Sequence, residues 1–270
     1  MEHPVNLKAK EILGCKGLCK SFFTKEGNAD RVLQVVKDLE LEVYDKEFVV
    51  LFGPAECGKS TIINLLSGLD SPTAGQVFHD SLPVTCPDPK RGVIYQSIAL
   101  FPWLSVMGNV EFGLKAQGVG QAERRQKAQY LIDLVKLTGF ENSFPNELSG
   151  GMCQRVGIAR AYCNEPEILF MDEPFGALDA QTRYMMEEEI SRLHLIEQRT
   201  VVFVTNNIEE AIYLADRIVL LHNKPTSVKN EYRIEMPRPR DYTSPDFLAL
   251  RRQITHDLDK ADSGMAGSDE

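Results

Sequence analysis

The stretch Phe48-Val-Val-Leu-Phe-Gly-Pro-Ala-Glu-Cys-Gly-Lys-Ser60 joins five apolar residues to a glycine-containing loop. Its second part, residues 53–60, fits the phosphate-binding pattern G-x-x-x-x-G-K-[ST]. The short apolar run predicts a strand that is buried on both faces, and residues 61–68 predict a helix directly after the loop. Loop N–H groups and a helix N-terminus both attract anions. The stretch therefore predicts a site for the phosphates of a nucleotide.

The side chains of this loop have different expected tasks. Lys59 is expected to reach the β and γ phosphates, and the Ser60 hydroxyl is expected to bind Mg²⁺. The complete set of nucleotide contacts predicted in this stretch is Gly53, Pro54, Ala55, Glu56, Cys57, Gly58, Lys59, Ser60 and Thr61. A chance glycine turn is the alternative, but such a turn would not need both the preceding strand and the following helix.

A second apolar run, Ile168-Leu-Phe-Met-Asp-Glu173, ends in two carboxylates. Ligands of open α/β sheets bind at the carboxyl ends of the strands, so we expect both carboxylates at the nucleotide. Asp172 is expected to orient Mg²⁺, and Glu173 is expected to act as the general base on the attacking water. The pattern is common by itself and becomes specific through the phosphate loop upstream.

The rest of the chain alternates between strand and helix patterns. Residues 11–50 are rich in strand patterns, and a separate lobe is predicted to start near Ser97. Gln121–Thr138 predicts an amphipathic helix, because Ala128, Leu131, Ile132 and Val135 recur at spacings of three and four. Further expected elements are helices over 151–162, 208–215 and 247–258 and strands over 168–171, 200–205 and 217–221. This order predicts a mostly parallel α/β sheet.

Composition and charge exclude several classes of protein. The chain has 270 residues, of which 43% are hydrophobic and 26% charged, as is typical of a globular protein with a full core. The net charge of −9 argues against a nucleic-acid partner. No stretch reaches the roughly 18 apolar residues that a membrane span needs, and the first residues lack the apolar core of a signal peptide. The six cysteines lack the clustered spacing of a zinc site and are expected to be free thiols.

The segment Leu148-Ser-Gly-Gly-Met152 resembles the signature of the ABC ATPase family, in which L-S-G-G precedes a helix. The resemblance implies that Ser149, Gly150 and Gly151 contact the nucleotide of a second subunit, so that two subunits enclose two ATP molecules. It also implies an α/β fold: a P-loop NTPase (RecA-like) core with a mostly parallel sheet, an N-terminal antiparallel β subdomain and an inserted α-helical subdomain.

Several other segments follow in the order of this family over residues 10–222. The pair Tyr95-Gln96 resembles the Q-loop, which implies that Gln96 contacts Mg²⁺ and the catalytic water. Ala177-Leu-Asp179 resembles the D-loop, which crosses to the partner subunit. Phe22, or its neighbour Phe23, lies where the family stacks an aromatic ring on adenine, and packing in the core is an equal alternative.

The resemblance also implies the domain bounds. Residues 1–259 are expected to form the ATPase domain, with the helical subdomain at about 97–163 and a C-terminal extension at about 224–259. Residues 260–270 are small and polar and are expected to be disordered.

The segments Phe101-Pro-Trp103, Met171–Asp179 and Glu210–Asp216 resemble ATP-binding subunits of importers, most closely the nitrate, sulfonate and taurine group. This implies ATP and Mg²⁺ as cofactors, two membrane permease subunits, an extracytoplasmic solute-binding protein, and a peripheral location on the cytoplasmic face of the inner membrane. Residues 97–113 are expected to face the permease, with Phe101, Trp103 and Leu104 receiving a helix; packing of these side chains inside the lobe is the alternative.

Three positions depart from the family pattern. Asn206 stands where the family has a histidine that contacts the γ-phosphate, and Glu56 stands where it has a glycine. Cys153 replaces a residue that is often polar or basic. Asparagine can donate a hydrogen bond but cannot carry charge or shuttle a proton. Two interpretations follow: unimpaired hydrolysis, or a subunit that hydrolyses slowly and acts by ATP-driven dimerisation beside a competent partner. A ribosome- or DNA-acting ATPase is a third, disfavoured by the acidic charge and the single cassette.

Overall fold

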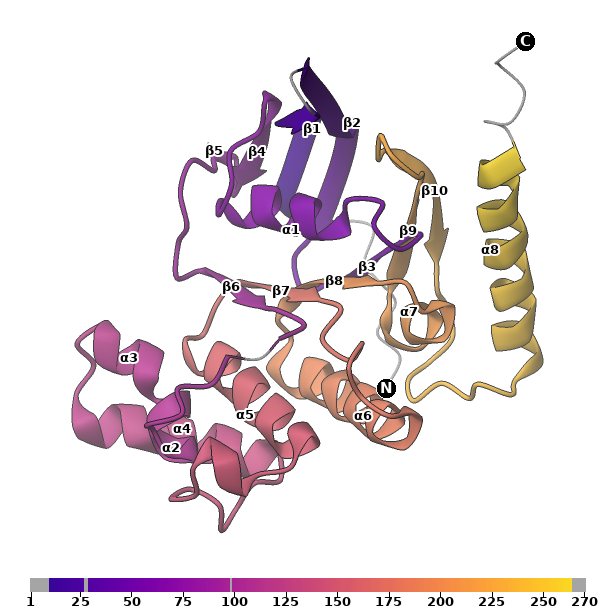
Figure 1. Ribbon diagram of the computed structural model, residues 1–270. Coiled ribbons are helices and arrows are strands. Elements are labelled where there is room, and N and C mark those ends of the chain that lie inside the picture. The colour runs from indigo at the N-terminus through magenta and orange to yellow at the C-terminus, as the bar shows by residue number, and fades with distance from the viewer. Residues whose placement is uncertain (1–9, 27–28, 98, 264–270) are drawn as a thin grey trace. The chain divides into compact units, whose positions relative to one another are not determined.

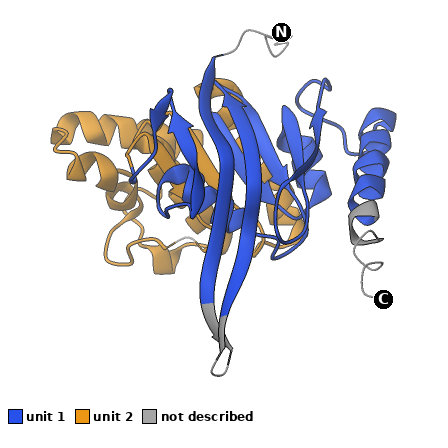
Figure 2. Ribbon diagram, turned by 90° about the horizontal axis from the view of Figure 1, so that it is seen from above, with its two compact units in different colours: residues 1–87, 200–270 blue, residues 88–199 orange. Residues whose placement is uncertain are grey.

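The computed structural model describes residues 10–26, 29–97 and 99–263, and contacts within the chain divide it into two units. The first unit comprises residues 1–87 and 200–270, and the second comprises residues 88–199 (Figure 2). The second unit is longer than the helical subdomain expected at 97–163, because it also contains two strands and a long helix outside that range.

An antiparallel sheet in the first unit has the strand order β2-β1-β4-β5 (Figure 1). Its strands are β1 (Glu11–Glu26), β2 (Ala29–Tyr44), β4 (Ala74–His79) and β5 (Leu82–Pro83). In the β1–β2 hairpin, Phe22 pairs with Leu33. Leu13, Leu18 and Val36 are fully buried, so apolar side chains of this sheet contribute to the core of the unit.

Three parallel strands form the centre of the first unit. β3 (Phe48–Phe52) lies between β8 (Thr200–Thr205) and β9 (Arg217–Leu221), and both run parallel to it. Every residue of these strands is buried, as expected for apolar strands covered on both faces. β10 (Val228–Arg233) pairs antiparallel with β9. The sequence pattern does not predict β10, because Lys229, Asn230 and Glu231 interrupt any apolar alternation.

Three helices complete the first unit. α1 (Lys59–Ser67) begins directly after Gly58 and ends at Gly68, and both glycines have left-handed backbone angles. α7 is Ile208–Leu214. α8 (Pro245–Ser263) is longer than the helix expected at 247–258. It extends to Ser263 and so includes the first residues of the segment expected to be disordered from residue 260; residues 264–270 lie outside the described part.

The second unit contains two parallel strands and most of the helices. Its strands are β6 (Arg91–Ile94) and β7 (Ile168–Asp172). Its helices are α2 (Val106–Val110), α3 (Phe112–Ala116), α4 (Gln121–Leu134), a 3-10 helix (Pro145–Glu147), α5 (Gly150–Cys163) and α6 (Ala180–Glu197). The predicted apolar face of α4 is buried, but the helix ends at Leu134 rather than Thr138. Lys136 has a φ of 59°, a value that residues within an α-helix do not adopt.

The structure thus has parallel and antiparallel sheets within a mixed α/β fold, as the sequence predicts. Within residues 10–26, 29–97 and 99–263, no helix is both long and apolar enough to cross a bilayer.

Candidate nucleotide-binding site

The phosphate loop follows β3 directly and packs closely against β9. A Cβ on Gly53 would lie 3.1 Å from Leu221 Cβ and 3.2 Å from Cys57 Sγ, so glycine suits the start of the loop. Cys57 is fully buried, and burial raises the pKa of its thiol. Its side chain therefore belongs to the core, while the loop backbone remains for ligand contacts.

Lys59 lies inside the loop. Its ammonium donates to the carbonyl oxygens of Gly53 (3.1 Å) and Pro54 (2.7 Å), and only 4% of the residue is exposed. The cation is thus held at the start of the loop by two backbone acceptors. A phosphate is a stronger acceptor than a carbonyl, so these contacts are open to exchange for a ligand.

Glu56 has a φ of 59°, the left-handed region that favours glycine, and its side chain is exposed. The substitution noted in the sequence therefore adds backbone strain at the loop. Its carboxylate is exposed to solvent, which reduces repulsion of a bound phosphate.

Asn206 directly follows β8, beside the phosphate loop. Phe52 of β3 pairs with Thr205 of β8 in parallel register, so Gly53 and Asn206 are the residues that leave adjacent strands. Asn206 is exposed, whereas its neighbour Asn207 caps α7 by accepting from the backbone N–H of Glu209 (2.8 Å) and Glu210 (3.3 Å). The first unit thereby brings together the loop and the position expected at the γ-phosphate.

Thr205 and Asn207 hold this segment and were not among the predicted residues. The Thr205 hydroxyl accepts from the Asn207 N–H (2.9 Å) and donates to Glu210 (2.6 Å). The signal in the sequence is an asparagine directly before an acidic first helical turn, which is typical of a helix N-cap.

The second unit brings Gln96 to the segment that follows β7. Asp172 ends β7, and Glu173 after it has a φ of 43°. A Cβ on Gly176 would lie 2.8 Å from Gln96 Nε2, and the Gly176 N–H donates to the Glu173 carbonyl (3.1 Å). Gln96 therefore lies against the turn that carries the predicted catalytic glutamate.

Gln154 links α5, the helix that begins within the signature segment, to the turn that follows β7. Its Nε2 donates to the Pro174 carbonyl (2.5 Å), and it is buried. Ser149 caps α5 by accepting from the Met152 N–H at 3.3 Å. Gly150 has open space where a Cβ would be, which permits close approach by another molecule. The sequence pattern does not single out Gln154, because a glutamine inside a helix gives no recognisable signal.

The two aromatic candidates for adenine are on the surface of the first unit. Phe22 is 38% exposed and Phe23 is 81% exposed, so the alternative that these rings pack in the core is wrong. Lys20 Nζ lies 5.1 Å from the centroid of the Phe22 ring. A cation therefore covers part of the Phe22 ring.

The aromatic residues expected at the permease differ in exposure. Phe101 packs on Phe112 (centroids 4.3 Å apart) and under Arg160 (5.5 Å), whereas Trp103 is 70% exposed. Phe101 is thus partly packed inside the lobe, as the alternative expects, whereas Trp103 is not.

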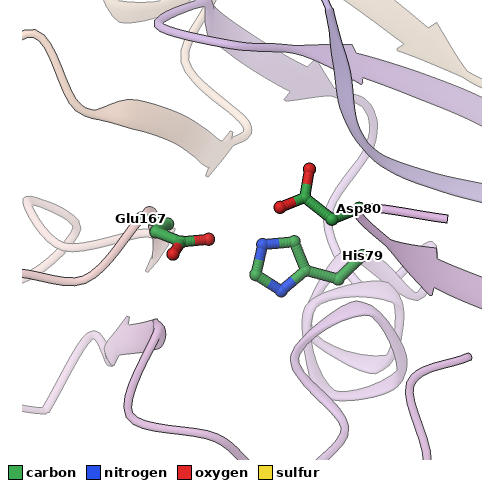
Figure 3. Close-up of side chains that lie close together, drawn as sticks. All are labelled: His79, Asp80 and Glu167. Carbon is green, nitrogen blue, oxygen red and sulfur yellow. The ribbon is translucent and has the colours of Figure 1, made fainter. Parts of the chain in front are cut away.

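Figure 3 shows three potential metal ligands outside the nucleotide site, His79, Asp80 and Glu167. Asp80 forms an ion pair with Lys10 in the first unit, and Glu167 forms one with Lys90 (2.8 Å) in the second. Each carboxylate is thus neutralised within its own unit, and we assign no metal to these residues.

Proteins that bind nucleotides through a phosphate loop have a strand, a glycine-containing loop with a lysine, and a helix directly after the loop. This chain has all of these features, so it belongs to that class of nucleotide-binding proteins. The ABC transporter family matches residues 36–176. The chain is 39% identical to the aliphatic sulfonates import ATP-binding protein SsuB of Bacillus subtilis over 89% of this chain and 92% of that protein. It is 43% identical to the nitrate import ATP-binding protein NrtD of Synechocystis sp. over 75% of this chain and 76% of that protein.

A solved structure is also similar. It is a dimeric ATP-binding cassette in a post-hydrolysis state bound to ADP and Pi, with a TM-score of 0.71 and 32% identity over 83% of this chain and 99% of that chain. These matches show that the chain belongs to the ABC transporter family as an ATP-binding subunit. It is a transport ATPase of that family.

Proposed function

We propose that the chain is the subunit whose ATP hydrolysis drives import of a small solute such as nitrate, a sulfonate or taurine. The observation that carries the proposal is the phosphate loop, with Lys59 buried inside it, in a chain similar to import ATPases over most of its length. The loop amides and Lys59 bind the phosphates, and Phe22 stacks on the base.

The proposed metal is Mg²⁺, held by the Ser60 hydroxyl, the Gln96 amide oxygen and the Asp172 carboxylate. All three are hard oxygen donors, which is the chemistry that Mg²⁺ requires. The ion neutralises phosphate charge when it is bound. Glu173 polarises the attacking water.

We further propose a dimer of ATP-binding subunits on the cytoplasmic face of the membrane, attached to two permeases and served by a solute-binding protein. Ser149, Gly150 and Gly151 complete the site of the partner subunit. The exposure of Trp103 supports a permease contact on the second unit.

A second candidate is a subunit that binds ATP but hydrolyses it slowly, beside a competent partner. Two observations favour it: the strained φ of Glu56 and the exposed asparagine at position 206, which leaves the end of β8 without an imidazole. Steady-state phosphate release by the purified chain separates this candidate from the first.

Uptake of labelled nitrate, taurine and an alkanesulfonate tests the transport proposal in a host that lacks the gene for this chain. Restoring the wild-type gene should restore uptake of one of these solutes, whereas Lys59→Ala should not, because the motor then binds ATP poorly. Normal uptake of all three solutes without the gene would contradict the proposed cargo class.

A further inference from the structure

The turn between β9 and β10 places Thr226 against the phosphate loop of the same unit. Thr226 is fully buried. Its N–H donates to the Val35 carbonyl (2.7 Å), and its own carbonyl accepts from the Lys37 N–H (3.0 Å). Two backbone bonds to β2 therefore fix Thr226, and its hydroxyl donates to the carbonyl of Cys57 within the loop.

That hydroxyl bond sets the orientation of the peptide unit between Cys57 and Gly58. The C=O and N–H of a planar trans peptide point in opposite directions. Because the Cys57 carbonyl points toward Thr226, the Gly58 N–H points away from Thr226. The same N–H belongs to the loop donors that bind phosphate in proteins of this class.

Contacts on the Thr226 side also confine this peptide. A Cβ on Gly58 would lie 2.8 Å from Val35 Cγ1 and 2.9 Å from Thr226 Oγ1, and Gly58 has a φ of 118°. Among the amino acids, only glycine adopts this backbone conformation readily. The same freedom would let the peptide rotate if nothing else held it. A hydrogen bond from a fixed hydroxyl counters that freedom.

We propose that Thr226 is a positioning residue of the nucleotide site, whose hydroxyl holds the Cys57–Gly58 peptide so that the Gly58 N–H faces the bound phosphate. The inference rests on the proposed function, since it takes this loop to be the site of ATP. Thr226 lies far along the chain from the loop and fits no phosphate-binding pattern.

Calorimetric titration with ATP and Mg²⁺ tests the inference on wild type, Thr226→Val and Thr226→Ser. Valine removes the hydroxyl at similar volume, and we expect ATP affinity to fall roughly three- to tenfold, as for one lost hydrogen bond. Serine keeps the hydroxyl and should retain wild-type affinity within about twofold.

Thr200→Val is the matched control. Thr200 is buried in the same unit, and its hydroxyl accepts from the Lys46 N–H (2.9 Å) at the opposite end of β8 from the loop. This variant should lower the unfolding midpoint without nucleotide but leave ATP affinity unchanged. A loss of ATP affinity in Thr226→Val but not in Thr200→Val therefore cannot come from a general loss of stability.

Equal ATP affinity of wild type and Thr226→Val would overturn this inference and leave the nucleotide site in place. Failure of the wild type to bind ATP would overturn the proposed function and this inference together. If Thr226→Val does not fold, Thr226→Ala is compared with Thr226→Ser, and equal affinities of those two overturn the inference.

Discussion

Asn206 is the residue whose chemistry departs furthest from the family pattern. It leaves β8 beside the phosphate loop, and a histidine there would offer a cationic donor to the transferring phosphoryl group. We predict that Asn206→His raises steady-state phosphate release about tenfold or more with little change in ATP affinity, because the charge that it stabilises grows in the transition state.

Asn142→His is the control for this change, since Asn142 is exposed in the second unit and is not among the proposed site residues. It should leave the rate unchanged. A wild-type rate typical of an import ATPase, with no response to Asn206→His, would rule out the impaired-site candidate.

Glu56 gives a second prediction at this scale. Glycine removes the strain of a φ of 59° and one negative charge near the phosphates, so Glu56→Gly should raise ATP affinity and stabilise the fold by up to about 1 kcal/mol. Glu165→Gly is the matched control, because Glu165 has a φ of 51° in the second unit. A gain in affinity from both variants, measured by calorimetry, would show that strain relief rather than the loop is responsible.

The sequence predicts which residues form the loop, but it does not predict their geometry. The pattern around Gly53 and Lys59 is local, and a local pattern suffices to place a phosphate loop. The partners of Lys59, the left-handed angle of Glu56 and the role of Thr226 depend on tertiary contacts, which no local pattern records.

At the scale of elements, the segment before α8 contacts the end of α7 and holds the C-terminal region against it. Arg240 is buried and donates to the carbonyls of Ile212 (2.8 Å) and Tyr213 (2.9 Å) at the end of α7, while Tyr242 stacks on Tyr213 at 4.6 Å. A cation at the C-terminus of a helix satisfies its last carbonyls and interacts favourably with its dipole.

We predict that Arg240→Ala lowers the free energy of unfolding by about 2–3 kcal/mol, since it removes charge-assisted bonds from buried carbonyls. Urea unfolding measures this change. Arg252→Ala, at an exposed position of α8, should change stability by less than about 0.5 kcal/mol. Similar losses of unfolding free energy from both variants would contradict the proposal that Arg240 holds the C-terminal region against α7.

Elements with a strong apolar period are predicted well, and polar ones are not. Strand β8 has the predicted bounds, because its residues Thr200–Thr205 are all buried. The pattern around α4 continues past Leu134, but Lys136 turns left-handed, and only the tertiary structure reveals that end. β10 and α6 carry several polar or charged residues, so their patterns are weak although the structure forms both.

At the scale of the whole molecule, the central expectation is a dimer that closes around ATP. Glu173→Gln removes the proposed general base and retains the shape of the site, so a dimer that light scattering detects should accumulate with ATP and Mg²⁺. Glu173→Gln combined with Lys59→Ala is the control and should stay monomeric, because it binds ATP poorly. A monomer of Glu173→Gln at saturating ATP would exclude the homodimer and favour a heterodimer.

Calorimetric titration of ATP and Mg²⁺ into wild type, Lys59→Ala and Lys46→Ala tests the central claim most directly. Lys46 is exposed at the opposite end of β3 from the loop, so its removal should leave affinity unchanged. Lys59→Ala should weaken ATP binding at least about tenfold, or about 1.4 kcal/mol, because we propose the buried ammonium as the main cationic phosphate contact. Equal ATP affinity of wild type and Lys59→Ala would contradict the placement of the nucleotide at this loop.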